Sequence, residues 1–280
     1  MQSSKLRIGI ISAEKSGDYL AASFIESLKS SGRNFELFGI GGKELDKFNI
    51  SKPQDFDREI LNVMGIIDPL KNLRQILRAR KQILDFLISK NINIFIGVDS
   101  PDLNSFFHKK LKKINSTINF QIVSPSVWAW RSGRVKQLRK FVDTTFCLFK
   151  FEHDYLKKNN VNSFHVGHPF QDIEKVEDVS SIKNRYGINN DSECLTFLVG
   201  SRRSEISNML SIYKRVIKKV YEGDKSYSFL FPVVNQDHKN IIQAELSELE
   251  TPIFIQTDKM KEFLSLSTFT ISTSGTASLE

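Results

Sequence analysis

Two carboxylates follow the most apolar stretch of the chain, residues 92–98, and are candidates for acid–base chemistry. Asp99 comes directly after this stretch and Asp102 three residues later, within residues 97–104. A carboxylate at the end of a buried strand can take a proton from a hydroxyl group, and partial burial raises its pKa towards a useful range. Asp102 and Asn104 have an equally good structural interpretation, as the N-cap of a following helix.

The first apolar stretch, residues 6–11, also ends in polar residues. Residues 12–18 include Glu14 and Ser16 among small residues that let the main chain approach a ligand. The segment matches neither the dinucleotide-binding glycine pattern nor the P-loop. Ser16 or Asp18 is expected to cap the next helix. Capping gives Glu14 no structural role, so Glu14 is the candidate functional residue of this segment.

Two tryptophans that stand one residue apart mark a third segment, residues 123–131. Trp128 and Trp130 are accompanied there by Ser126 and Arg131. Tryptophan is costly to expose and often packs against sugars or acyl chains. The alternative is a loop that the two rings anchor in the core.

Two further turns are candidates for phosphate binding. Residues 199–205 place Ser201 and Arg202 where an apolar run meets a helix, so main-chain N–H groups, the helix dipole and a guanidinium could meet a phosphate. The alternative is a surface turn with solvated arginines. Residues 272–280 repeat this arrangement, with Ser274, Gly275 and Thr276 in the predicted turn. Glu280 lies one turn into the predicted helix, where its carboxylate could bind ribose hydroxyls.

Short apolar runs alternate with amphipathic segments along the whole chain, which predicts two open parallel α/β sheets of the Rossmann type. The strands are expected at 6–11, 35–40, 92–98, 118–123, 144–149, 163–166, 194–199, 228–234, 253–256 and 268–272. The clearest helices are expected at 18–30, 70–89, 205–221 and 237–249. In such sheets ligands bind beyond the carboxyl ends of the strands, where all five segments lie.

A change in composition along the sequence predicts two domains, residues 1–172 and 173–280. Residues 171–181 are acidic and poor in large apolar side chains, which is typical of a linker or hinge. His165 and His168 lie just before this segment, and a histidine in such a position is more often structural than functional.

Composition narrows the class of protein. The 280 residues have a net charge of +8, which suits nucleic acid, an anionic membrane surface, a phosphorylated substrate or simply a solvated basic surface. No run approaches the length of a membrane span, and no signal peptide or metal-ligand spacing is present. Cys147 and Cys194 lie in apolar runs, as buried thiols of a reducing compartment do. We therefore expect a cytoplasmic protein without a structural metal.

Seven motifs, in order along the chain, resemble the lipid-A-disaccharide synthase family of inverting GT-B glycosyltransferases. They are AEKSGD (13–18), VMGIID (63–68), GVDSPDLN (97–104), SPSVWAWR (124–131), GHPF (167–170), GSRRSEI (200–206) and SGTASLE (274–280). SPSVWAWR is the most specific of them, whereas the last is shared with other GT-B enzymes. The resemblance implies two Rossmann-like domains that face a cleft, with the acceptor side in the first and the nucleotide-sugar in the second.

The resemblance also implies a reaction. UDP-2,3-diacylglucosamine would donate its sugar to 2,3-diacylglucosamine 1-phosphate (lipid X), without a cofactor or a required metal, at the inner-membrane surface and without nucleic acid. Asp99 would be the general base, assisted by Glu14. Arg202, Ser201, the Ser274–Thr276 turn and Glu280 would bind UDP. The acceptor side would comprise Ser16, Asp102, Asn104, Ser126, Trp128, Trp130, Arg131 and His168.

Some alternatives stay open at this point. A peptidoglycan glucosaminyltransferase or a UDP-GlcNAc 2-epimerase shares the two-domain plan and the last motif. Relatives are expected to continue past Glu280, so the second domain is expected to be incomplete and an inactive truncated paralogue is a further alternative. A homodimer is compatible with all of these.

Overall fold

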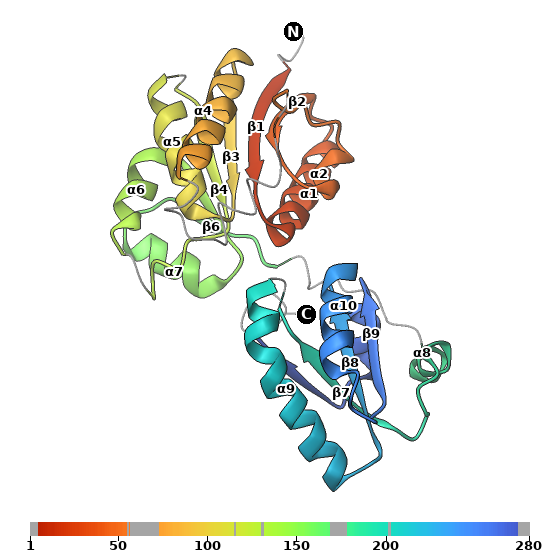
Figure 1. Cartoon of the computed structure of the whole chain (residues 1–280). Helices are drawn as coiled ribbons and strands as arrows, with labels where there is room; N and C mark the ends of the chain where they lie inside the picture. Colours follow the sequence, from red (N-terminus) through yellow and green to blue (C-terminus); the bar gives the residue numbers. More distant parts are fainter. Residues whose placement is uncertain are drawn as a thin grey trace. The chain divides into compact units, whose positions relative to one another are not determined.

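The protein divides into two compact units, Met1–Gln171 and Asp172–Glu280, in a computed structural model (Figure 1). The structure describes residues 5–54, 56, 73–114, 116–129, 132–168, 178–200 and 203–273. Each unit is an α/β sheet with its own core, and each is described by itself.

The N-terminal unit contains a six-stranded parallel sheet in the order β2-β1-β3-β4-β5-β6. Its strands are β1 (Leu6–Ser12), β2 (Phe35–Ile40), β3 (Ile94–Val98), β4 (Ile118–Ile122), β5 (Thr144–Cys147) and β6 (Ser163–His165). Its helices are α1 (Lys15–Ser30), α2 (Lys43–Asp46), α4 (Leu73–Ser89), α5 (Pro101–Ile114), α6 (Arg134–Phe141) and α7 (Lys150–Lys158). The predicted parallel sheet is confirmed.

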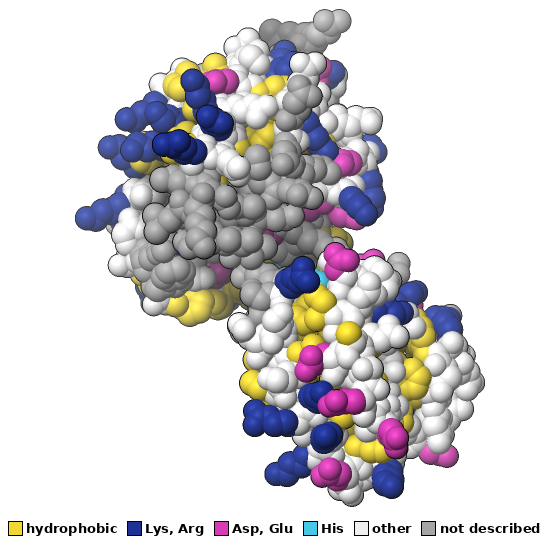
Figure 2. Space-filling model, viewed as in Figure 1, with side chains coloured by type: hydrophobic (Ala, Val, Ile, Leu, Met, Phe, Trp, Pro, Cys, Tyr) yellow, Lys and Arg dark blue, Asp and Glu magenta, His cyan; other side chains and the backbone are white. Residues whose placement is uncertain are grey.

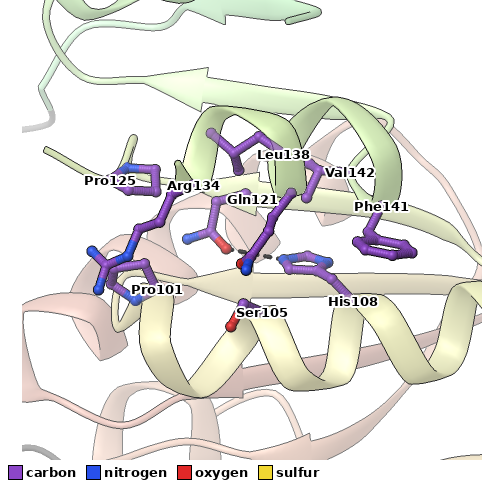
Figure 3. A pocket seen from close by; sticks show the side chains of 10 residues that line it. Pro101, Ser105, His108, Gln121, Pro125, Arg134, Leu138, Phe141 and Val142 are labelled. Carbon is purple, nitrogen blue, oxygen red and sulfur yellow. Dashed lines mark hydrogen bonds between the residues drawn. The ribbon is translucent and has the colours of Figure 1, made fainter. Parts of the chain in front are cut away.

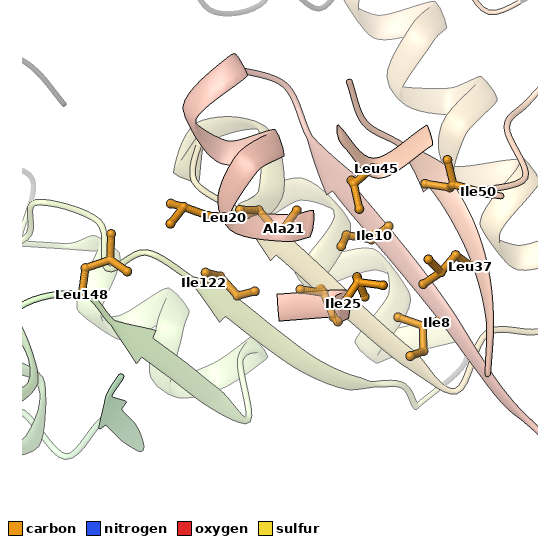
Figure 4. Close-up of a cluster of buried hydrophobic side chains, with 12 residues drawn as sticks. Ile8, Ile10, Leu20, Ala21, Ile25, Leu37, Leu45, Ile50, Ile122 and Leu148 are labelled. Carbon is orange, nitrogen blue, oxygen red and sulfur yellow. The ribbon is translucent and has the colours of Figure 1, made fainter. Parts of the chain in front are cut away.

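Apolar side chains cover both faces of this sheet, because alternate residues of each central strand point to opposite faces. Ile8 and Ile10 of β1 pack against Ile25 of α1 in one core (Figure 4). On the other face, Phe95 of β3 packs with a second cluster that includes Phe107 of α5 and residues of α4. The two cores fix β1 and β3 side by side, so their carboxyl ends open at the same edge.

The C-terminal unit contains a four-stranded parallel sheet in the order β10-β7-β8-β9. Its elements are α8 (Val179–Tyr186), β7 (Glu193–Leu198), α9 (Arg203–Gly223), β8 (Tyr227–Val233), α10 (Gln236–Leu246), β9 (Ile253–Thr257), α11 (Met260–Leu266) and β10 (Phe269–Ser272). One core lies under α9 and α10 and a second under α8 and α11. The second predicted parallel sheet is confirmed as well.

Several predicted boundaries differ from the structure, and two of them have a clear local cause or consequence. The expected linker reaches residue 181, whereas α8 already begins at Val179, because the Asp178 carboxylate accepts a hydrogen bond from the Ser181 N–H and caps that helix. The strand expected at 144–149 ends at Cys147, and α7 begins three residues later.

Both cysteines, Cys147 and Cys194, are buried free thiols, as predicted. Burial raises the pKa of Cys147 to about 12, so this thiol is inert. Within the described ranges no helix is both long and apolar enough to cross a membrane. The same residues contain no group of three or more His, Cys, Asp or Glu that could hold a metal ion.

Candidate active site

The carboxyl ends of β1 and β3 bring the first two predicted segments together. Gly17, in the first turn of α1, lies against both: a Cβ added there would stand 2.9 Å from the Ser12 Oγ and 3.5 Å from the Asp99 Cβ. Glu14 occupies the N-cap position of α1 with an extended main chain, and both Glu14 and Ser16 are half-buried. The structure therefore brings Ser12 and Asp99 together at one end of the sheet, and Glu14 lies between Ser12 and the start of α1.

The prediction that Ser16 or Asp18 caps α1 is wrong. No side chain caps this helix. The buried Asp18 carboxylate instead accepts hydrogen bonds from the main-chain N–H groups of Gly42 (2.6 Å) and Glu44 (2.8 Å) at the start of α2. Asp18 thus supplies a cap to a helix that begins 25 residues later, which ties α1 to α2.

Asp99, the predicted general base, lies in an environment that raises its pKa. Its carboxyl group is half-buried, and loss of solvent raises the pKa of Asp99 above the ordinary value, although a hydrogen bond from the Ser100 N–H opposes the rise. The main chain leaves β3 through two residues with positive φ, Asp99 (49°) and Ser100 (39°). Such conformations are costly for residues other than glycine and concentrate at functional sites.

Asn104, expected on the acceptor side, lies in the first turn of α5. The side chain is fully buried, and its Nδ2 donates to the main-chain carbonyls of Val98 (3.1 Å) and Asp99 (2.8 Å). Asp102 is exposed and forms an ion pair with Arg134 of α6. Because α5 begins at Pro101, Asp102 and Asn104 lie inside its first turn, and the alternative prediction that either is the N-cap is wrong as well.

Sequence reasoning missed two buried polar residues behind Asp99, Gln121 of β4 and His108 of α5. Their side chains point towards one another, with 3.0 Å between His108 Nε2 and Gln121 Oε1 (Figure 3). Burial lowers the pKa of His108 to about 4, so the ring is neutral at physiological pH. A glutamine inside the apolar run 118–122 was the available signal, because a buried polar group requires partners.

A small cavity adjoins this pair, lined by His108, Gln121, Arg134 and neighbouring side chains of α5 and α6 (Figure 3). Its volume is about 20 Å³. That is close to the space that one water molecule needs, so the cavity is not a substrate pocket.

Aromatic rings form a surface beside the sheet. Trp128 is 48% exposed and packs edge-on against Phe151, with ring centroids 5.1 Å apart. Phe151 stacks on Phe149, and Phe149 stacks on His168. Loss of solvent lowers the pKa of His168. Trp128 and His168, expected on the acceptor side, thus belong to one aromatic row, whereas Ser126 is exposed in the turn before Trp128.

In the C-terminal unit, the ends of β7 and β10 lie side by side. Thr273 donates to the Leu198 carbonyl through both its N–H (3.1 Å) and its Oγ1 (3.0 Å). Gly200 has φ +93° and is pressed against Glu205 of α9, so a side chain would not fit at that position.

The predicted residues that lie outside the described ranges are Trp130, Arg131, Ser201, Arg202, Ser274, Gly275, Thr276 and Glu280.

Solved structures share this architecture at low sequence identity. The chain aligns with the S. aureus MnaA–UDP co-structure at TM-score 0.66 and 11% identity, covering 97% of this chain and 74% of that one. It aligns with the UDP-GlcNAc 2-epimerase from Neisseria meningitidis bound to UDP-GlcNAc at TM-score 0.65 and 12% identity, covering 97% and 78%. These likenesses confirm the predicted GT-B-like fold.

Sequence comparison identifies the family. The model described as lipid-A-disaccharide synthetase matches residues 8–280. The lipid-A-disaccharide synthase of Hydrogenovibrio crunogenus is 35% identical over 274 residues, covering 97% of this chain and 72% of that protein. The corresponding protein of Francisella philomiragia is 32% identical over 280 residues, covering 98% and 73%. The chain therefore belongs to the lipid-A-disaccharide synthetase family.

Proposed function

We propose that this protein condenses UDP-2,3-diacylglucosamine with 2,3-diacylglucosamine 1-phosphate to give the lipid A disaccharide 1-phosphate and UDP. Family membership makes it a glycosyltransferase of lipid A biosynthesis that uses nucleotide-sugar and lipid-linked substrates, and does not favour a peptidoglycan glucosaminyltransferase or an epimerase. The observation that carries the mechanism is the half-buried Asp99 carboxyl group with its raised pKa at the end of a central strand.

Asp99 acts as the general base in this proposal. Its carboxylate takes the proton of the acceptor 6-hydroxyl as that oxygen attacks the anomeric carbon of the donor. The new carbon–oxygen bond forms while the bond from the anomeric carbon to the diphosphate oxygen breaks, and UDP departs with the bonding electron pair. Attack from the face opposite the leaving group inverts the anomeric centre. The raised pKa of Asp99 makes its carboxylate a stronger base than an exposed one.

The acceptor is bound by the N-terminal unit. Glu14 and Ser16 lie in the turn that adjoins Asp99, and Ser126 and Trp128 lie in the loop after β4, the strand that pairs with β3. Trp130, Arg131, Asp102 and His168 complete the proposed acceptor side. Asn104 is not assigned a substrate contact in this proposal, because its side chain is fully buried and its Nδ2 donates to main-chain carbonyls.

The donor is bound by the C-terminal unit. Arg202 and Ser201 follow β7, and the Ser274–Thr276 turn follows β10, whose end is tied to the end of β7 through Thr273. The N-terminus of α9, which follows a parallel strand, suits a diphosphate, and Arg202 adds bidentate contacts that stabilise departing UDP in this proposal. Glu280 holds the ribose in this arrangement.

The acylated, anionic substrates reside at the inner-membrane surface, and the protein binds that surface peripherally in our proposal. Lys and Arg atoms cluster over α4 and α5 on the face that Figure 2 shows. The exposed cations of these two helices are Arg74, Arg78, Lys81, Lys109, Lys110 and Lys113. Each cation near an anionic headgroup contributes roughly 1 kcal/mol to membrane attraction.

Paired assays test the proposed reaction. The protein is incubated with UDP-diacylglucosamine plus lipid X, and separately with UDP-GlcNAc plus an undecaprenyl-linked acceptor. Turnover is expected with the first pair alone, and turnover with the second pair alone would refute the proposal.

Variants test the assigned roles. Asp99→Asn removes the base but keeps the shape of the side chain, so turnover is expected to be lost while UDP binding, measured by calorimetry, is retained. Wild-type rates for Asp99→Asn would remove Asp99 from the mechanism. Arg202→Ala is expected to raise the KM for the donor, and unchanged donor kinetics would contradict its role.

A further inference from the structure

Three residues at the carboxyl ends of β3 and β4 hold strained main-chain conformations. Asp99, Ser100 and Val123 have φ values of 49°, 39° and 72°. Each such conformation costs on the order of 1–3 kcal/mol outside glycine, and a β-branched valine is especially unfavourable there. These three residues lie at the ends of two paired strands, so the surrounding structure must hold this segment in place.

Two buried side-chain amides hold it. Gln121 Nε2 donates to the main-chain carbonyls of Asp99 (3.2 Å), Ile122 (3.0 Å) and Val123 (3.3 Å). Asn104 Nδ2 donates to the same Asp99 carbonyl from α5, at 2.8 Å. A carbonyl oxygen has two lone pairs, so the Asp99 carbonyl is fully occupied by these two side chains.

The carbonyls and His108 together hold the Gln121 amide in one orientation. Three main-chain carbonyls face Gln121 Nε2, so Gln121 Oε1 faces His108. The His108 Nε2 is 3.0 Å from that oxygen and carries the shared proton. Gly97 leaves room for both amides, since a Cβ there would stand 2.8 Å from Asn104 Cβ and 2.9 Å from Gln121 Oε1. The arrangement thus requires residues from β3, β4 and α5 together.

We infer that Gln121 and Asn104 are positioning residues for Asp99, whose carbonyl they clamp so that its carboxyl group is held towards the acceptor. This inference rests on the proposed role of Asp99 as the base. Both amides are buried, and their N–H groups donate to main-chain carbonyls. A displacement of about 1 Å in a reacting group can lower the rate up to about 100-fold, so the clamp acts on the chemical step rather than on binding.

Gln121→Met tests the clamp, because methionine keeps the length of the side chain and removes its donor. We expect kcat to fall about 10- to 100-fold with the KM for both substrates nearly unchanged. The acid limb of the pH profile is expected to move to lower pH, because a carboxyl group released from its half-buried position regains solvent.

Asn119→Leu is the matched control. Asn119 lies two residues earlier on β4 and is equally buried, and its Nδ2 also donates to two main-chain carbonyls, those of His108 (3.0 Å) and Phe141 (2.8 Å). It stands at the amino end of the strand, away from Asp99. Asn119→Leu should therefore lower stability like Gln121→Met but leave kcat within about twofold of wild type.

A wild-type kcat for folded Gln121→Met, or an equal loss of kcat in Asn119→Leu, would overturn the inference. If Gln121→Met does not fold, as judged by circular dichroism, Asn104→Ser removes the other arm of the clamp. That variant is expected to lower kcat without changing KM, and a wild-type kcat would count against the clamp in the same way.

A double-mutant cycle separates this inference from the proposed function. If Gln121 acts through Asp99, adding Gln121→Met to Asp99→Asn produces no further fall in the residual rate. Independent, multiplying effects would overturn the clamp while the base role stands. Full activity of Asp99→Asn alone would instead overturn the base role, and with it the clamp.

Discussion

Gly17 lies so close to Asp99 that a methyl group at position 17 would be in van der Waals contact with the Asp99 Cβ, at 3.5 Å. The same methyl group would stand only 2.9 Å from the Ser12 Oγ. The first turn of α1 and the end of β3 therefore share one tightly filled space, and a side chain at position 17 would enter it.

Gly17→Ala is expected to lower kcat/KM about tenfold, because the Ser12 hydroxyl must move and the added methyl group fills space beside Asp99. Stability should change little, since alanine is about 1 kcal/mol better than glycine in a helix and offsets part of the crowding. Gly223→Ala in α9 is the control, because nothing lies within 4 Å of the added methyl group. Wild-type kinetics for Gly17→Ala would show that the site tolerates the extra atom.

Asp18→Ala is expected to destabilise the N-terminal unit by about 3 kcal/mol, because the first main-chain N–H groups of α2 lose a buried carboxylate acceptor. Asp178→Ala, which removes one main-chain acceptor contact at the start of α8, should lower stability by only about 1 kcal/mol. Urea denaturation followed by circular dichroism measures both. Equal losses would mean that Asp18 contributes no more than an ordinary cap.

The raised pKa of Asp99 predicts where activity is lost in acid. A general base works only when deprotonated, so kcat/KM falls as the pH drops through its pKa. Because burial raises that pKa, the acid limb should lie above the ordinary aspartate value of about 3.9. A pH–rate profile measures it, and an acid limb at or below the ordinary value would contradict the half-buried environment.

His108 makes stability depend on pH. In the unfolded chain the ring takes up a proton below about pH 6.5, whereas its pKa in the folded protein is about 4. Its contribution to stability is thus fully present above pH 6.5 and is lost as the pH falls towards 4, by up to about 3 kcal/mol. His108→Phe keeps the ring that packs edge-on against Phe95 and should remove this part of the dependence.

The comparison requires urea denaturation of wild type and His108→Phe at about pH 7 and about pH 4.5. The difference between the two pH values isolates His108, because the other titrating groups are common to both proteins. Parallel pH dependence in the two proteins would mean that the ring is not held neutral.

The aromatic row predicts a binding defect without a folding defect. Trp128→Ala combined with Phe151→Ala should raise the KM for the acylated acceptor about tenfold, as expected when roughly 1.4 kcal/mol of apolar contact is lost. The melting temperature should barely move, because both side chains are about half exposed, at 48% and 51%. Ile118→Ala, 50% exposed at the amino end of β4, is the control. An unchanged acceptor KM would remove the row from the acceptor side.

The sequence predicted both sheets because each central strand is an unbroken apolar run such as residues 94–98. A run of this kind is typical of a strand that is buried on both faces of a parallel sheet. It did not predict the partners of the polar residues around them. Asp18 caps a helix 25 residues away, and the Gln121 amide meets a histidine from a preceding helix. These pairings depend on which elements the fold places side by side, and local spacing does not contain that information.

The neighbours of β7 set the order in which the C-terminal sheet can assemble. β8 and β9 follow β7 directly along the chain, whereas β10 pairs with the other edge of β7 and is fastened by Thr273, 75 residues after Leu198. During synthesis β7, β8 and β9 emerge first and form a three-stranded sheet with β7 as an open edge. Until residues 269–273 leave the ribosome, that edge of β7 is unpaired, and we expect it to be open to pairing with strands of other chains during this interval.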